Sequence, residues 1–282
     1  MKPFGLFIIA LSLIVVSASH TSAAPSAGSS PHLKKIFEKG VIRIGVQILS
    51  PLYQQQEEKQ GIDVEIANQI GADLGVKVEL VTGTPSELID MVSQGVIDMS
   101  LGGISSTVQR GLKIRFTRAY IIATPAGLLN RMKLPEESAS IDFPKRRIES
   151  LRDLQIPGRL IVGVRSGSTN ETIFRTDKKF STYQIETFKT NLDVLDALTQ
   201  NRIDLLVGDD LWIRSILKTR PELITKFQPI LGSYSEEHLS VALPPGDPEF
   251  LLFIDFMIKE YRRTGIITQI LERYIDVTRD VR

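Results

Sequence analysis

The alternation of strand-like and helix-like segments, which occurs twice, sets the strongest limit on how this 282-residue chain folds. In the first half, strands are predicted at residues 41–46, 76–81 and 96–101, with helices between them at 61–75 and 86–95. The helical segments place apolar residues every three or four positions, and glycines stand at their expected ends. Strands that alternate with helices at this spacing favour βαβ units and a mainly parallel sheet.

The second half of the chain repeats the pattern. Strands are predicted at 160–164, 183–188 and 203–207, and helices at 169–174 and 191–200. Five residues also recur 106 positions further along, namely Asp90, Gln94, Ile97, Asp98 and Gly102 as Asp196, Gln200, Ile203, Asp204 and Gly208. We therefore expect two similar α/β lobes.

The first 23 residues have the order of a secretory signal peptide. Lys2 precedes an apolar stretch at 4–16, and small and polar residues follow at 17–24. The apolar stretch is shorter than the ~20 residues that a membrane-spanning helix needs, and an uncleaved anchor is the alternative. Cleavage at the end of residues 1–23 would leave a flexible leader at 24–32 and a soluble, periplasmic mature protein.

Composition excludes several classes of function. The 34 basic and 33 acidic residues give a formal charge of +1, so no strongly basic face is expected and nucleic acid is a poor candidate partner. The absence of cysteine excludes disulfides, thiolate metal sites and a lipidated N-terminal cysteine. Of the three histidines, only His238 lies outside the predicted signal peptide and leader. The chain also lacks a phosphate-binding glycine loop and a nucleophile elbow. We expect no catalytic residue, no metal and no cofactor.

The loops after the predicted strands are expected to carry the function, because ligands of open α/β sheets bind beyond the carboxyl ends of the strands. These loops are small and polar, and they comprise Gly102, Gly103, Ser105 and Arg110 in the first lobe and residues 166–169 and 208–210 in the second. Hydroxyls supply hydrogen bonds, and a guanidinium binds a carboxylate through two parallel ones. A small zwitterion, with its carboxylate towards Arg110 and its ammonium towards Asp209, would satisfy both lobes.

Several segments, in this order, carry a resemblance to a known family. They are residues 38–46, 61–66 with Asp63 and Glu65, 102–110, 116–120, 164–169 and 203–209. The set resembles the polar amino acid family of bacterial extracellular solute-binding proteins, family 3. The resemblance runs from about Leu33 to Tyr274.

This resemblance implies a type II periplasmic-binding-protein-like α/β fold, with two lobes, each a mixed sheet flanked by helices, joined by two hinge crossovers. Lobe 1 would comprise residues 33–121 and 239–282, and lobe 2 residues 126–230. The crossings would fall near 121–127 and 230–239. Helices at 248–263 and 266–274 would pack on lobe 1, the former capped by Asp247.

The resemblance also implies roles for individual residues. Arg110 would bind the ligand's α-carboxylate, assisted by Ser105 and by the backbone at Thr169, while Asp209 would bind the α-ammonium. Including neighbours, the expected ligand-binding residues are Arg110, Asp209, Ser105, Gly103, Gly102, Thr169, Ser168, Gln47 and Tyr53.

Three features depart from the family pattern. Tyr53 is displaced from the usual aromatic position after the first strand, and no aromatic stands near residues 84–85. Gln47 stands where members that bind basic ligands have an acid, which disfavours lysine and arginine. Residues 135–147 look like an insertion, and their basic run is expected to be a solvated loop.

Structural alternatives apply to most of these residues. Arg110 could be a surface arginine or a member of an ion pair. Asp210 is expected to cap the helix that starts at Leu211, which leaves Asp209 for the ligand. Trp212 either lines the cleft or packs under the loop.

The sequence thus predicts a monomeric binding protein that captures a polar or neutral L-amino acid by cleft closure and supplies the permease subunits of an ABC transporter. One alternative is a periplasmic cyclohexadienyl or arogenate dehydratase-like enzyme, for which Asp210 is the candidate acid. The other is a ligand-sensing module for a separate membrane receptor.

Overall fold

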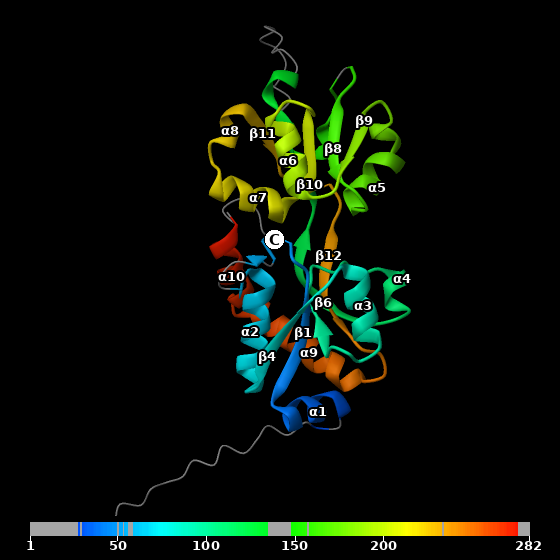
Figure 1. Cartoon of the computed structure of the whole chain (residues 1–282), viewed down its shortest axis with the longest axis vertical. Coiled ribbons are helices and arrows are strands. Elements are labelled where there is room, and N and C mark those ends of the chain that lie inside the picture. Colours follow the sequence, from blue (N-terminus) through cyan, green and yellow to red (C-terminus); the bar gives the residue numbers. More distant parts are fainter. Residues whose placement is uncertain are drawn as a thin grey trace, which may run out of the picture.

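The computed structural model describes residues 28, 30–49, 51–52, 54–55, 59–134, 148–156, 158–232 and 234–275. These residues form two lobes, each built on a five-stranded mixed sheet flanked by helices (Figure 1). This is the predicted two-lobed α/β fold with two crossovers. The signal peptide predicted at residues 1–23 lies outside the described residues, as does the insertion at 135–147.

The first sheet has the strand order β4-β1-β5-β12-β6. Its strands are β1 (Val41–Val46), β4 (Lys77–Thr82), β5 (Met99–Ser100), β6 (Arg115–Ala123) and β12 (Glu237–Leu243). β1 pairs in parallel with β4 and β5, whereas β12 is antiparallel to β5 and β6. The associated helices are α1 (Pro31–Lys39), α2 (Ile62–Leu74), α3 (Pro85–Ser93), α4 (Val108–Gly111), α9 (Pro248–Arg263) and α10 (Ile266–Tyr274). A small hairpin joins β2 (Gln54–Gln55) and β3 (Lys59–Gln60).

The second sheet has the order β11-β7-β10-β8-β9, and β7 is antiparallel to both of its neighbours. Its strands are β7 (Pro125–Asn130), β8 (Ile161–Arg165), β9 (Gln184–Phe188), β10 (Leu205–Asp209) and β11 (Phe227–Ile230). Its α-helices are α5 (Thr169–Thr176), α6 (Asn191–Thr199), α7 (Asp210–Thr219) and α8 (Leu223–Lys226). Short 3-10 turns cover Arg131–Lys133, Leu151–Asp153 and Lys178–Phe180.

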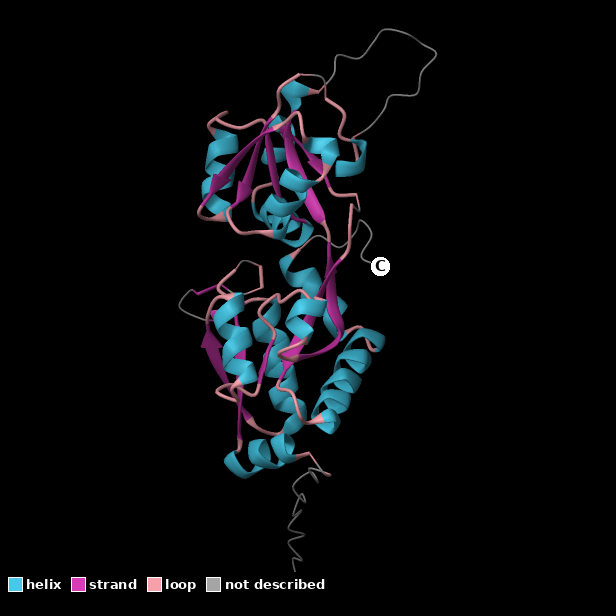
Figure 2. Cartoon of the chain, turned by 90° about the vertical axis from the view of Figure 1, so that its right-hand side faces the viewer, coloured by secondary structure: helices cyan, strands magenta, loops and turns pink. Residues whose placement is uncertain are grey.

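The chain crosses between the lobes twice, and one residue holds the two crossings together. β6 ends at Ala123 and β7 starts at Pro125, so only Thr124 separates the sheets on the first crossing. The second crossing leads from β11 to β12. The hydroxyl of Thr124 accepts a hydrogen bond of 3.0 Å from the backbone N–H of Tyr234 on that second crossing. Figure 2 shows both segments running side by side between the lobes.

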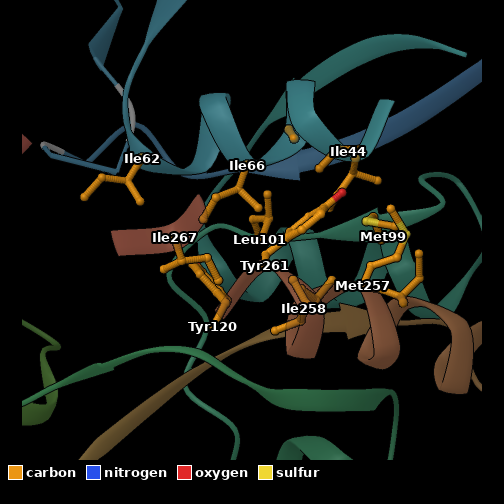
Figure 3. Close-up of a cluster of buried hydrophobic side chains, with 14 of the residues drawn as sticks. Ile44, Ile62, Ile66, Met99, Leu101, Tyr120, Met257, Ile258, Tyr261 and Ile267 are labelled. Atoms are coloured by element: carbon orange, nitrogen blue, oxygen red, sulfur yellow. The ribbon is translucent and has the colours of Figure 1, made fainter. Parts of the chain in front are cut away.

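The core of the first lobe lies between α2, the sheet and the two C-terminal helices. Figure 3 shows Ile62 and Ile66 of α2 facing Ile258 of α9 and Ile267 of α10, and all four side chains are buried. The bounds of α9 and α10 agree with the prediction from the sequence. Asp247 caps α9 as expected, since its carboxylate accepts the N–H of Phe250 at 2.9 Å.

Two helix starts differ from the sequence-based expectation. Thr84, rather than Ser86, caps α3, because its side chain and that of Glu87 form a reciprocal capping box. α1 begins at Pro31, within the segment expected to be a flexible leader. Ser30 caps this helix and donates a hydrogen bond of 2.8 Å to Asp247, which ties the start of α1 to α9.

The internal repeat has a structural counterpart in a pair of aspartates. Asp98 accepts the backbone N–H of Arg43, in β1, at 2.8 Å. Asp204 accepts that of Ile161, the first residue of β8, at 2.9 Å. The two residues, 106 positions apart, therefore hold β1 in the first lobe and β8 in the second in the same way.

The lobes also touch at α7 and α10, away from the crossings. The ammonium of Lys218 on α7 donates hydrogen bonds of 2.5 and 2.9 Å to the carbonyls of Glu272 and Arg273. Leu211, at the start of α7, packs into the core of the first lobe. α7 of the second lobe therefore rests on the first.

Candidate interlobe ligand site

A buried tyrosine and a buried aspartate hold the Gly102–Gly103 turn after β5 through hydrogen bonds. The hydroxyl of Tyr120 accepts the N–H of Gly103 at 3.2 Å and donates to Asp63 at 2.8 Å. Gly103 has a φ of +58°, and a Cβ there would lie 2.4 Å from Leu52. Only glycine fits such a position without strain. Close packing against Leu52 therefore requires glycine at this position of the turn.

Burial raises the pKa of Asp63 to about 7, against the opposing effect of its hydrogen bonds with Tyr120 and the glycine turn. Asp63 belongs to the resemblance motif in α2, where an acid also suits the helix start. The structural role of Asp63 is to anchor the turn that carries the candidate site.

Arg110 and Ser105 lie together on the first lobe. Arg110, on the short helix α4, is half-buried, and its Nη1 donates a hydrogen bond of 2.8 Å to the carbonyl oxygen of Ser105. Arg110 makes no ion pair with another described residue. Its guanidinium is thus held beside the Ser105 carbonyl by a hydrogen bond rather than by an ion pair with a described residue.

The start of α5 contributes the second lobe's hydroxyls. The hydroxyl of Ser168 donates to the carbonyl of Arg165 at 2.6 Å and accepts the N–H of Glu171 at 3.1 Å, so it is engaged in capping α5. Thr169 is exposed, and its hydroxyl donates to Glu237 at 3.1 Å. Of the two predicted residues, Thr169 has the hydroxyl that faces the other lobe.

The expectation for the aspartate pair after β10 is wrong in one respect. Asp209, rather than Asp210, caps α7, since its Oδ1 accepts the N–H of Trp212 at 2.8 Å. Asp210 instead accepts the N–H of Thr124 at 3.0 Å and lies 3.5 Å from Arg214. The carboxylate of Asp210 is thus engaged at the first crossing, and the cap of α7 falls one residue earlier.

The surroundings of Asp209 disfavour its ionised form. Burial and the negative charges of Asp210 and Glu237 raise its pKa to about 6, despite the hydrogen bond from Trp212. Among the described residues no donor is assigned to its Oδ2. A carboxylate whose charged form is disfavoured in this way gains from a nearby cation.

Trp212 packs under the loop and is 3% exposed. A Cβ on Gly208 would lie 2.7 Å from its ring, so this tryptophan supports the turn before Asp209 from the inside.

Glu237, the first residue of β12, is a site residue that the sequence did not reveal. Its Oε1 accepts hydrogen bonds from the hydroxyl of Ser105 and from that of Thr169, one from each lobe. The available signal was the acidic pair Glu236-Glu237 within the predicted return crossing. We call Ser105, Arg110, Thr169, Asp209 and Glu237 the interlobe site.

The remaining predicted residues lie at its border or outside the described residues. A Cβ on Gly102 would lie 3.6 Å from the backbone nitrogen of Gln47, so the loop after β1 adjoins the glycine turn. Tyr53 is outside the described residues. Two surface hollows, one beside Tyr183 and one along β4, are not lined by any residue of the interlobe site.

The described part of the chain contains no group of three or more histidine, aspartate or glutamate residues arranged to hold a metal ion. None of its helices is long and apolar enough to cross a membrane.

Two mixed α/β lobes joined by two crossovers, with polar loops from both meeting at the join, define a type II periplasmic-binding-protein-like fold. Comparison with known families agrees with this architecture. The chain belongs to the bacterial extracellular solute-binding proteins, family 3, whose model matches residues 42–277.

Individual relatives are distant. The cyclohexadienyl dehydratase of Pseudomonas aeruginosa is 24% identical over 280 residues, which cover 98% of this chain and 96% of that protein. The membrane-bound lytic murein transglycosylase F of Aeromonas hydrophila is 27% identical over 279 residues, or 96% of this chain, and these span 51% of the enzyme. The structure of an ancestral cationic amino acid solute-binding protein superposes with a TM-score of 0.72 at 22% identity, covering 86% of this chain and 99% of that one.

Proposed function

We propose that this protein captures a polar or neutral L-amino acid between its lobes and supplies it to the permease subunits of an ABC transporter. The observation that carries the proposal is the convergence of Ser105 and Thr169, one from each lobe, on a single carboxylate oxygen. Loops that are 64 residues apart in the sequence thus meet at one point, where a ligand that touches both would favour closure.

The charges at this point suit an α-amino acid. Arg110 supplies a cation next to Ser105, and Asp209 supplies an anion at the start of α7. Hydrogen bonds to charged groups contribute about 1.5–3 kcal/mol each. A ligand with both a carboxylate and an ammonium would form such hydrogen bonds with both lobes. A ligand with only one of these groups would form them with a single lobe.

The side-chain class follows from the loop after β1. Gln47 borders the glycine turn and carries no charge, so this residue can offer hydrogen bonds but no ion pair to the ligand side chain. A polar or neutral side chain fits this border. The proposed location is the periplasm, after removal of residues 1–23, and the proposed state is a monomer that binds no nucleic acid.

A thermal-shift panel of the twenty amino acids tests the proposal. A ligand present at 100 times its dissociation constant stabilises the folded protein by ~2.7 kcal/mol. One or a few L-amino acids should raise the melting temperature, and their D-enantiomers should not. The absence of any shift with the whole panel would remove amino acid capture as the function.

A dehydratase activity is the second candidate, supported by the relative from Pseudomonas aeruginosa and by the raised pKa of Asp209, about 6, which lets this group donate a proton near neutral pH. Asp210, the acid expected from the sequence, faces Thr124 and Arg214 instead. Incubation with prephenate or arogenate, followed by detection of an aromatic product, decides this alternative. The matched control is the Asp209→Asn variant.

A further inference from the structure

One carboxylate of the chain itself occupies the place where both lobes present hydroxyl groups. Glu237 lies at the start of β12, where the second crossing enters the first sheet. Its Oε1 accepts the hydroxyl of Thr169 at 3.1 Å together with that of Ser105. Ser105 lies on the loop after β5, and Thr169 is the first residue of α5. A single oxygen atom therefore bridges lobe 1, lobe 2 and the crossing.

The position of this oxygen is chemically specific. Hydroxyl groups donate short hydrogen bonds to carboxylates, and Ser105 also lies next to Arg110, whose guanidinium reaches the Ser105 carbonyl at 2.8 Å. A ligand carboxylate would be attracted to this same group of donors. Two carboxylates cannot share one pair of hydroxyl hydrogens, and their like charges repel at such a separation.

The charge of Glu237 also reaches the other half of the interlobe site. It is one of the groups that raise the pKa of Asp209, after burial and Asp210. Glu237 is only partly buried and lies on the first residue of its strand, so its side chain has room to leave. Its neighbour Glu236 is exposed and faces His238 at 3.2 Å, away from the hydroxyl pair.

We propose that Glu237 is an internal occupant of the carboxylate half of the interlobe site, which links the two lobes when no ligand is bound and is displaced by the carboxylate of the incoming ligand. This inference rests on the proposed function. It adds a residue that sets affinity by competing with the ligand, and it requires that the ligand itself carry a carboxylate.

The direct test is the Glu237→Gln variant, which keeps the size of the side chain and removes its charge. Isothermal titration with the amino acid identified by the thermal-shift panel should show binding at least about fivefold tighter than in the unmodified protein, because the competing carboxylate is gone. Glu236→Gln makes the same change of charge one residue away and should alter the affinity less than about twofold. Unchanged or weaker binding by Glu237→Gln overturns the proposal.

Weaker binding that is confined to ligands with a positively charged side chain would also overturn it, since Glu237 would then contact the ligand rather than compete with it. A matched pair such as arginine and citrulline, which differ in charge and little in shape, reveals that outcome.

The ligand-free protein provides a second, independent test. A double-mutant cycle in thermal unfolding combines Glu237→Gln with Thr169→Val, an exposed position that tolerates the change. The two effects should be non-additive if the interlobe bridge exists in solution, whereas additive effects would overturn it. This cycle needs no ligand, so a failure of the amino acid panel removes the proposed function while the cycle still decides the bridge.

Discussion

The guanidinium of Arg110 lies 2.8 Å from the carbonyl oxygen of Ser105, so the first lobe presents a cation and a hydroxyl at one place. On the second lobe, Thr169 donates to the same Glu237 oxygen as Ser105, and the charge of Glu237 also acts on Asp209. The arrangement makes the interlobe site asymmetric in charge. Each member can be tested by a substitution with a defined partner.

Replacing Arg110 by alanine should weaken binding of the amino acid by about 2–5 kcal/mol, because a ligand carboxylate taken from water would lose its charged partner. Isothermal titration measures the change. Arg115 is the matched control, since it is exposed and its guanidinium donates to the carbonyls of Gly111 and Ile114 outside the site. Equal losses in Arg110→Ala and Arg115→Ala would count against a direct role for Arg110.

Binding should weaken as the pH falls from 7 to 5. The pKa of Asp209 is raised to about 6, so below that value this group is increasingly protonated and no longer attracts the ligand's ammonium. The affinity should fall by up to about tenfold per pH unit in this range. Asp209→Asn should bind weakly at every pH and lose this dependence, so an equal pH dependence in the variant would contradict the assignment.

The same raised pKa has the opposite effect on the stability of the ligand-free protein. The folded state binds the proton of Asp209 more tightly than the unfolded state, so its contribution to the free energy of unfolding decreases as the pH rises from about 4 to above 6. The free energy of unfolding, measured with urea at both pH values, should therefore fall more between pH 4.5 and pH 7.5 in the unmodified protein than in the Asp209→Asn variant. A smaller loss would show that burial does not disfavour the ionised form.

Tyr120→Phe should lower the free energy of unfolding by about 1–3 kcal/mol, because Gly103 and Asp63 would lose their buried hydrogen-bond partner. It should also weaken ligand binding, since the glycine turn would no longer be fixed. Tyr183→Phe is the comparison, as its hydroxyl accepts a long hydrogen bond of 3.4 Å from Ile156. Similar effects of the two changes would argue that the Tyr120 hydroxyl has no special role.

Gly208→Ala tests the support of the second lobe's site. The added Cβ would lie 2.7 Å from the ring of Trp212, and overpacking of this kind costs about 1–3 kcal/mol. The variant should also bind ligand more weakly, because Asp209 follows directly. Gly111→Ala, where no atom lies within 4 Å of the new methyl group, should leave the melting temperature nearly unchanged.

The regular elements were predictable because periodicity depends on local sequence. The bounds of β1, α9 and α10 agree with the predictions, and the lobes repeat as the matching Asp98 and Asp204 indicated. The strand expected at 96–101 is shorter, with β5 limited to Met99–Ser100, because pairing with β1 and β12 decides its length.

The site was less predictable, since it depends on contacts between segments that are distant in the sequence. Thr84 caps α3 in place of Ser86 through its reciprocal bonds with Glu87. Asp209 caps α7 in place of Asp210, whose carboxylate accepts the N–H of Thr124 on the first crossing. Glu237 lies on a crossing, where no periodicity specifies which way a side chain points. Only the folded arrangement brings it to Ser105 and Thr169.

The central claim is that Arg110 and Asp209 bind opposite ends of one amino acid, and a calorimetric cycle with modified ligands tests it most directly. The ligand identified by the panel is compared with its α-carboxamide and with its deaminated acid, in the unmodified protein, Arg110→Ala and Asp209→Asn. The account predicts that Arg110→Ala abolishes only the preference for the ligand over its α-carboxamide. Asp209→Asn should abolish only the preference for the ligand over its deaminated acid. Both preferences surviving in both variants would contradict it.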